Sequence, residues 1–194
     1  MKVVLMNGSR REKGCTYTAM TLVAEELNKA GIDTEILHVG GADSMNGNIN
    51  KLVDSLAEKV KEADGIVIGS PVYYASPSGE ILAVLDRLFG KAENDLRYKP
   101  CAVLASARRA GTTATLDVLN KYASYCEMPL VTSRYWNMVH GSKPEDVLQD
   151  KEGVQIMQVL GKNMAWMLKS IEAGKKAGVE QPQPVEKEMT NFIR

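Results

Sequence analysis

Short apolar runs alternate with amphipathic stretches along most of the chain, and this alternation constrains the fold more than any other feature. Five runs rich in β-type residues are expected to be strands: 3–6, 32–39, 66–68, 101–105 and a fifth that begins with 129–132. Between and after them, apolar residues recur at three- and four-residue steps typical of helices, over 19–30, 49–60, 81–89, 116–123 and 154–171. This order predicts an α/β fold: a doubly wound, five-stranded parallel sheet with helices on both faces.

The length and the polar end of the chain predict one domain followed by a tail. A chain of 194 residues suits a single α/β domain with a full core. We expect residues 1–174 to form that domain and residues 175–194, which contain Pro182 and Pro184, to form a polar C-terminal tail. The segment 40–50 is rich in Gly, Asn, Asp and Ser and is expected to be a loop.

Charge and cysteine content exclude several classes of protein. Lys plus Arg and Asp plus Glu number 24 each, so nothing suggests nucleic acid or an anionic membrane as a partner. No apolar stretch approaches the ~18 residues of a membrane span, and no signal-peptide pattern is visible. Three dispersed cysteines, Cys15, Cys101 and Cys126, fit a protein of the reducing cytoplasm. They are also too few for an iron–sulfur cluster, so we expect no bound metal.

The segment 7–18, which follows the first strand, carries the strongest chemical signal. It reads Asn7-Gly8-Ser9-Arg10-Arg11-Glu12-Lys13-Gly14-Cys15-Thr16-Tyr17-Thr18 and leads into a helix. Ligands of parallel α/β sheets lie outside the carboxyl ends of the strands, and amides at a helix start favour an anion. Hydroxyls of Ser9, Thr16 and Thr18 and the charge of Arg11 would add to those amides. We interpret this cradle loop as a phosphate site; the alternative is a capped helix after a solvated basic turn.

Exclusion narrows the phosphate ligand. Gly14-Cys15-Thr16 lacks the lysine of a nucleotide triphosphate loop, and no Gly-x-Gly-x-x-Gly dinucleotide pattern is present. The acidic residues of a receiver domain are missing after the first strand, as is the arginine of a Cys-x5-Arg phosphatase loop. A monophosphate held by hydroxyls and amides remains, and FMN fits that description.

Two further loops are expected at the same edge of the sheet. The segment 69–79 places Tyr73 and Tyr74 between Pro71 and Pro77, so that a flat ring could stack there; otherwise both tyrosines pack on the protein's own surface. The segment 106–113 brings Arg108 and Arg109 to the pyrimidine end of such a ring. At least one arginine would then stabilise the negative charge that two-electron reduction leaves there; alternatively both are solvated.

The segment 135–141 is expected to follow the fifth strand and to emerge on the ligand side. Trp136 would then anchor a loop, and His140 is a candidate pocket residue, although histidines in such places more often have structural roles.

Together these motifs resemble the NADPH-dependent FMN reductase branch of the flavodoxin-like proteins, most of all flavoproteins related to the iron–sulfur flavoproteins. The resemblance rests on Gly8-Ser9-x-Arg11, Gly14-Cys15-Thr16-Tyr17-Thr18, Ser70-Pro71-Val72-Tyr73-Tyr74 and Leu85-Asp86-Arg87, and it runs from about residue 1 to 171. It implies a flavodoxin-like sheet of strand order 2-1-3-4-5, bound FMN, NADH or NADPH as co-substrate, and a homodimer or homotetramer. The iron–sulfur members carry a compact cysteine cluster between the second and third strands, whereas residues 39–63 of this chain contain no cysteine.

The resemblance also implies roles for individual residues. Phosphate ligands would be Ser9, Arg11, Cys15, Thr16, Tyr17 and Thr18. Contacts to the isoalloxazine would come from Pro71, Val72, Tyr73 and Tyr74, and its pyrimidine side would meet Ala107, Arg108, Arg109, Gly111 and Thr112.

Two classes of function follow. The first is an enzyme that transfers hydride from NAD(P)H through FMN to a small-molecule acceptor such as a quinone, a flavin, or a nitro or azo compound. The second is a non-enzymatic protein, either a flavodoxin-type electron carrier or a flavin-binding regulatory protein. A carrier is expected to have a strongly acidic docking face, and the neutral balance of this chain therefore favours the enzyme.

Overall fold

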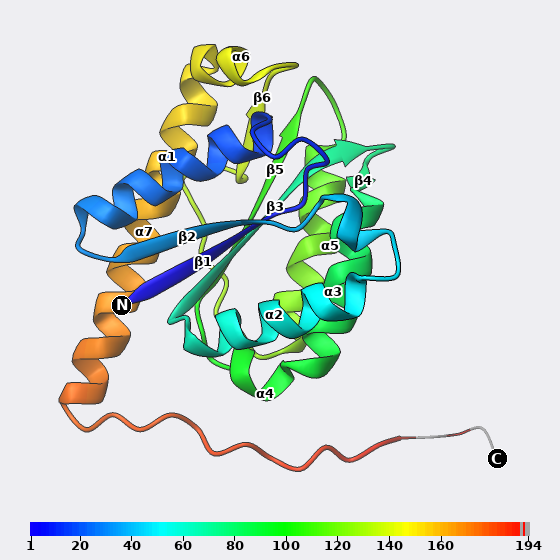
Figure 1. Ribbon diagram of the computed structural model, residues 1–194. Helices are drawn as coiled ribbons and strands as arrows, with labels where there is room; N and C mark the ends of the chain where they lie inside the picture. The colour runs from blue at the N-terminus through cyan, green and yellow to red at the C-terminus, as the bar shows by residue number, and fades with distance from the viewer. Residues whose placement is uncertain (191, 193–194) are drawn as a thin grey trace.

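The computed structural model describes residues 1–190 and 192, and its centre is a parallel sheet (Figure 1). The parallel strands are β1 (Lys2–Asn7), β2 (Asp33–His38), β3 (Gly65–Tyr73), β5 (Cys101–Ala107) and β6 (Met138–His140). They lie in the order β2-β1-β3-β5-β6, which is the expected order 2-1-3-4-5 of a flavodoxin-like sheet. A two-residue strand, β4 (Ser76–Pro77), adds an antiparallel pair at the end of β3.

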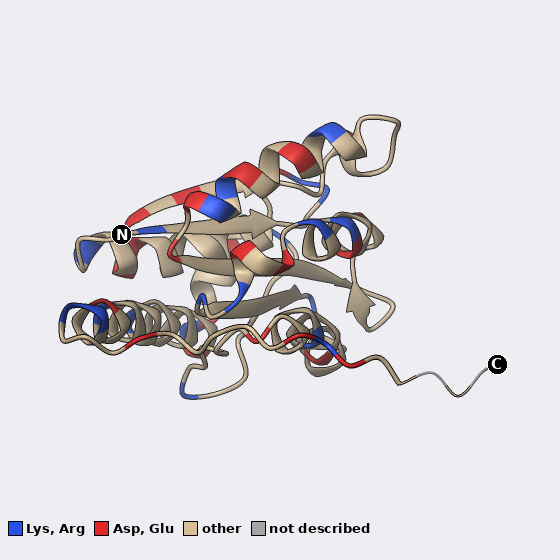
Figure 2. Ribbon diagram, turned by 90° about the horizontal axis from the view of Figure 1, so that it is seen from below, with Lys and Arg blue, Asp and Glu red and all other residues tan. Residues whose placement is uncertain are grey.

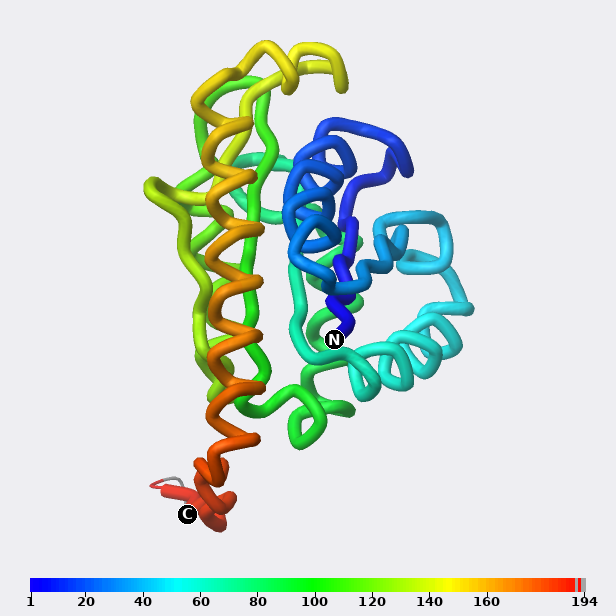
Figure 3. Tube along the Cα trace, turned by 90° about the vertical axis from the view of Figure 1, so that its left-hand side faces the viewer, coloured from blue at the N-terminus to red at the C-terminus, as the bar shows by residue number. Residues whose placement is uncertain are grey.

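Helices cover both faces of this sheet, as Figures 1 and 3 show. One face is covered by α1 (Cys15–Lys29), α6 (Pro144–Gln149) and the long α7 (Lys151–Lys176). The other face is covered by α2 (Ile49–Glu62), α3 (Gly79–Lys91), α4 (Glu93–Leu96) and α5 (Thr112–Tyr125). Side chains of β1 alternate between the two cores, because successive residues of a strand point to opposite faces: Val3 and Leu5 pack with α1 and α7, Val4 and Met6 with the other layer.

The expected fifth strand is displaced along the chain. Residues 129–132 make one bridge, between Leu130 and Cys101, and the chain then leaves the sheet before returning as β6. The side chain of Asn137 explains the return, because its amide donates to the carbonyl of Val103 at 2.9 Å. Trp136 therefore precedes β6 instead of following it. It lines a groove beside α5 and does not lie in a loop on the ligand side.

Smaller differences concern segment boundaries. The first helix begins at Cys15, so the end of the cradle loop is the first turn of α1. The expected loop 40–50 contains a short 3-10 helix, η1 (Ala42–Ser44). After α7, residues 177–190 form neither helix nor strand. Seen from below, acidic and basic residues are interspersed over the helices (Figure 2). None of the described helices is long and apolar enough to cross a membrane.

Candidate functional site

A cleft of about 300 Å³ opens at the carboxyl ends of β1, β3, β5 and β6. Four segments supply its walls: the cradle loop with the start of α1, the end of β3, the end of β5 and the turn after β6. The residues that line it are Ser9, Arg11, Gly14, Cys15, Thr16, Pro71, Val72, Tyr73, Ser106, Ala107, Arg108, Gly141 and Ser142. The cleft therefore lies where parallel α/β sheets bind their ligands.

Hydrogen bonds from β1 and β2 fix the cradle loop. The side chain of Asn7 accepts from the amide of Ser9 at 3.1 Å and donates to the carbonyl of Glu12 at 2.8 Å. Nε2 of His38 lies 2.7 Å from the carbonyl oxygen of Ser9. Gly14 is the N-cap of α1 and has no side chain to cap it, so the first amides of the helix stay available to a ligand.

Gly40 packs directly beneath the cradle loop. A Cβ at this position would lie 2.4 Å from the carbonyl carbon of Gly8 and 2.5 Å from the carbonyl oxygen of Ser9. Such distances are shorter than any ordinary contact between these atoms, so only glycine lets the chain after β2 approach the loop this closely.

Thr16 joins two walls of the cleft. Its hydroxyl lies 2.7 Å from the hydroxyl of Ser106 at the end of β5, and both residues are buried. One hydroxyl hydrogen of such a pair is used between the two oxygens, and the other is free for a ligand. This pair is therefore a preformed donor in the floor of the cleft.

The wall after β3 is a tight hairpin. Tyr74 (φ 52°) and Ala75 (φ 56°) occupy its two central positions between the paired residues Tyr73 and Ser76, and both have left-handed backbone conformations that residues other than glycine seldom adopt. Gly111, with φ 98°, lets the loop after β5 approach this hairpin, because a Cβ there would lie 2.8 Å from Cα of Ala75.

Arg10 of the cradle loop contacts both α3 and the hairpin after β3. Arg10 donates from Nε to Oε1 of Glu80, a carboxylate that is 4% exposed in the first turn of α3. The same guanidinium lies 5.7 Å from the centre of the Tyr73 ring, a cation–π distance. Among the described residues, Oε2 of Glu80 has no hydrogen-bond partner, so Arg10 is the main compensation for this buried charge.

The cleft is locally positive although the chain as a whole is neutral. Arg11 and Arg108 line it, no carboxylate does, and neither arginine forms an ion pair among the described residues. Burial raises the pKa of the Cys15 thiol, which therefore stays protonated at neutral pH. Its Sγ lies 3.5 Å from the carbonyl oxygen of Gly141, and this contact joins α1 to the turn after β6.

Several residues expected at the site do not line the cleft. Tyr17 and Thr18 follow Thr16 on α1, and the Thr18 hydroxyl donates to the Gly14 carbonyl at 3.3 Å. Tyr74 is fully exposed at the tip of the hairpin. Three more lie beyond Arg108: Arg109 is exposed, Gly111 caps α5, and Thr112 donates to the sulfur of Met138.

His140 ends β6 beside the cleft but does not line it. Nδ1 of His140 lies 3.6 Å from Oδ2 of Asp150. The same carboxylate oxygen accepts a hydrogen bond from the backbone amide of His140 at 2.7 Å. The two residues that follow it, Gly141 and Ser142, line the cleft instead.

Sequence reasoning missed these two residues, as well as Ser106, Gly40 and His38. Their common signal is their place at or just after the carboxyl end of a strand.

No group of three or more His, Cys, Asp or Glu side chains is arranged to hold a metal ion within residues 1–190 and 192. Cys101 and Cys126 are buried in the core, far along the chain from the cleft residue Cys15.

Comparison with known proteins gives this geometry a context. A family model described as NADPH-dependent FMN reductase matches residues 1–143. An iron–sulfur flavoprotein of Methanocaldococcus jannaschii is 30% identical over 192 residues, which cover 89% of this chain and 100% of that protein. An NADPH azoreductase of a Bacillus species is 30% identical over 123 residues, or 62% of this chain and 65% of that protein.

Among solved structures, the chain is similar to FerB of Paracoccus denitrificans, described as a flavoenzyme NAD(P)H:(acceptor) oxidoreductase. The TM-score is 0.68 at 16% sequence identity, and the match covers 87% of this chain and 97% of that one. At this identity the likeness supports the flavodoxin-like fold alone.

Proposed function

Because the chain belongs to the NADPH-dependent FMN reductase family, which makes it an oxidoreductase that uses FMN and NAD(P)H, we propose that its cleft binds FMN and that it reduces a small-molecule acceptor. The acceptor classes are quinones, flavins, and nitro or azo compounds; the last is favoured by the similarity to an NADPH azoreductase. One observation carries the proposal: hydroxyls, helix amides and two arginines that form no ion pair among the described residues converge in a cleft that no carboxylate lines.

The cradle loop fits a terminal monophosphate. The free amides at the start of α1 and the hydroxyls of Ser9 and Thr16 supply neutral donors, and Arg11 supplies charge. Cys15 is a small neutral residue at the same helix start, which lets the phosphate approach the backbone. Tyr17 and Thr18 would contribute through their place in the first helical turn, since their side chains do not line the cleft.

The other walls fit a flat ring. Pro71, Val72 and Tyr73 form one side, and Arg10 with Glu80 holds the tyrosine in place. Ala107 and Arg108, at the end of the neighbouring strand β5, form the next wall, where the guanidinium would stabilise negative charge. Bound FMN supplies the hydride chemistry, and the chain positions it, excludes water with the hairpin and lowers the energy of charge at the Arg108 end. Tyr74, at the exposed hairpin tip, would reach a ring only from outside the cleft.

The remaining parts of the proposal concern the whole protein. Residues 1–174 would be the FMN-binding domain and residues 175–194 an appended tail. Dispersed, unpaired cysteines favour the cytoplasm. Exposed aromatic residues, including Trp166 at 70% and Tyr125 at 69%, favour a homodimer or homotetramer.

Anaerobic titration of the FMN-loaded protein with NADH and with NADPH tests the function. We expect bleaching of the flavin band by at least one of them, followed by its return when a quinone or azo dye is added. The same preparation should contain no stoichiometric iron or acid-labile sulfide, because three dispersed cysteines do not supply a cluster.

Two results would contradict the proposal. A flavin that dithionite reduces but neither nicotinamide nucleotide does would favour the electron carrier or the regulatory protein. A released flavin identified as FAD would contradict the monophosphate site.

A further inference from the structure

Ser9 of the cradle loop is held through both of its backbone polar groups. Asn7 and His38, the last residues of β1 and β2, lie opposite each other in the parallel register. The side-chain oxygen of Asn7 accepts from the amide of Ser9 at 3.1 Å, and Nε2 of His38 lies 2.7 Å from the carbonyl oxygen of Ser9. Two neighbouring strand ends therefore fix the peptide groups on either side of this residue.

The bond from His38 reaches the loop from outside the cleft. A carbonyl oxygen only accepts, so Nε2 carries the hydrogen of this bond. The half-buried imidazole packs beside Gly41, where a Cβ would lie 3.3 Å from its Cε1, and it does not line the cleft. The carbonyl of Ser9 is consequently directed toward β2 and away from the space that a ligand would occupy.

The hydroxyl of Ser9 faces the start of α1 instead. Its Oγ accepts from the amide of Arg11 at 3.2 Å, and among residues 1–190 and 192 we find no acceptor for its hydrogen. A Cβ at Gly14, the N-cap of α1, would lie 3.4 Å from this oxygen. The free hydroxyl hydrogen and the free first amides of the helix therefore converge on one position for an anion.

We propose that His38 is a positioning residue for the phosphate of the flavin. Its hydrogen bond holds the Ser9 carbonyl away from the anion, and this keeps the Ser9 hydroxyl and the amides beside it aimed at the anion. Without the bond, the peptide group between Ser9 and Arg10 is free to rotate, and a carbonyl dipole turned toward the cleft repels a phosphate. The inference rests on the proposed FMN site and adds to it a residue that contacts neither the phosphate nor the ring.

Equilibrium titration with FMN and with riboflavin, which has the same ring but no phosphate, tests this role. His38→Leu removes the donor and should raise the Kd for FMN about 10-fold, while the Kd for riboflavin changes less than about 2-fold. His38→Gln places an amide nitrogen at about the reach of Nε2, so it should keep the Kd for FMN within about 3-fold of the native value. The matched control is His140→Leu, because Nδ1 of that histidine faces Asp150 and not the cradle loop; it should leave both constants unchanged.

Phosphorus NMR of the FMN-saturated protein gives a second measurement. In His38→Leu the resonance of the bound phosphate should move toward that of free FMN, because the donors around it are no longer held in place. The visible absorption band of the ring should keep its native shape, since the walls that contact the ring are unchanged. His38→Gln should show the native phosphorus resonance.

Equal losses of affinity for FMN and riboflavin in His38→Leu would mean that the histidine supports the fold as a whole, and the proposal would be wrong. An unchanged Kd for FMN in that variant, or a loss that His38→Gln does not restore, would overturn it as well. In each of these cases the native protein still binds FMN, so the proposed function stands. A native protein that binds neither flavin would contradict the proposed function and the role of His38 together.

Discussion

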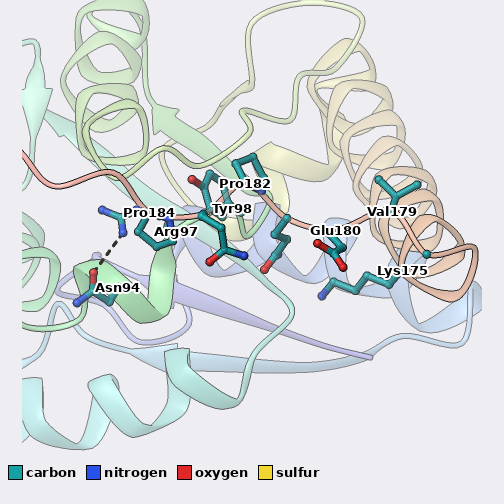
Figure 4. Close-up of a pocket in the computed structure, with 11 residues that line it drawn as sticks. Asn94, Arg97, Tyr98, Lys175, Val179, Glu180, Pro182 and Pro184 are labelled. Carbon is teal, nitrogen blue, oxygen red and sulfur yellow. Dashed lines mark hydrogen bonds between the residues drawn. The ribbon is translucent and has the colours of Figure 1, made fainter.

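The cleft at the carboxyl ends of the strands is three times smaller than a cavity at the opposite end of the sheet, yet only the cleft has the chemistry of a ligand site. The larger cavity, about 920 Å³, lies between the tail, the end of α7 and the residues before β5 (Figure 4), against about 300 Å³ for the cleft. Its arginine is already paired: Arg97 lies 2.9 Å from Glu127 and 3.6 Å from Glu93, and the Tyr98 hydroxyl donates to Glu127. Lys175 and Glu180, which also line it, bring opposite charges.

The cleft keeps its donors free instead. Arg11 and Arg108 have no carboxylate partner among the described residues, and the amides at the start of α1 follow a glycine N-cap. Both arginines are exposed, so it is their convergence with the buried hydroxyls of Ser9 and Thr16 and with the helix amides on one space, rather than volume, that indicates a ligand.

The largest expected effect on FMN affinity comes from a side chain added at Gly40, which packs against the backbone of the cradle loop. Gly40→Ala puts a methyl group against the backbone of the cradle loop, and the resulting shift should weaken FMN binding by about 3 kcal/mol, roughly 150-fold. Fluorescence titration of FMN measures this.

Two controls distinguish a local effect from a general one. Gly47→Ala lies in the same loop and meets nothing within 4 Å, and Pro182→Ala changes the larger cavity; both should bind FMN normally. If Gly40→Ala binds normally too, the cradle loop is not the phosphate site.

Thr16 and Thr18 lie two residues apart at the start of α1, and comparing their variants tests which hydroxyl contributes to FMN binding. Thr16→Val removes a buried hydroxyl from the floor of the cleft and leaves Ser106 without its partner, so FMN affinity should fall by about 2 kcal/mol, some 30-fold. Thr18→Val removes a hydroxyl that bonds the Gly14 carbonyl outside the cleft and should change affinity less than about 3-fold. Equal losses in the two variants would show that the hydroxyls act through helix stability alone.

The sequence predicted most strands, all long helices and most of the cleft because these depend on local patterns, whereas the sheet order followed from the family resemblance. Apolar periodicity marks strands and helices, and parallel strands bring the residues after each carboxyl end together, which is why Ser9, Thr16, Tyr73 and Arg108 meet.

Features set by distant contacts were not predictable in this way. The fifth strand was misplaced because Asn137 returns the chain to β5 through a side-chain bond to Val103, which no periodicity records. Gly40 and His38 matter through their approach to a loop thirty residues earlier in the sequence. Tyr74 was expected in the wall, but two consecutive left-handed residues turn the hairpin tip outward.

The smallest expected effect separates two neighbouring arginines at the end of β5. Both side chains are exposed, but Arg108 lines the cleft and Arg109 lies outside it. A cation beside a partly dry site lowers the energy of negative charge there far more than bulk water does. Arg108→Gln should therefore make reduction of bound FMN harder and lower its two-electron potential by ~30 mV, which corresponds to about 1.4 kcal/mol. Arg109→Gln, an equal loss of charge just outside the cleft, should leave the potential unchanged, and spectroelectrochemistry measures both. Unaltered potentials in the two variants, with a raised KM for NADPH in either, would assign these arginines to the nicotinamide nucleotide instead.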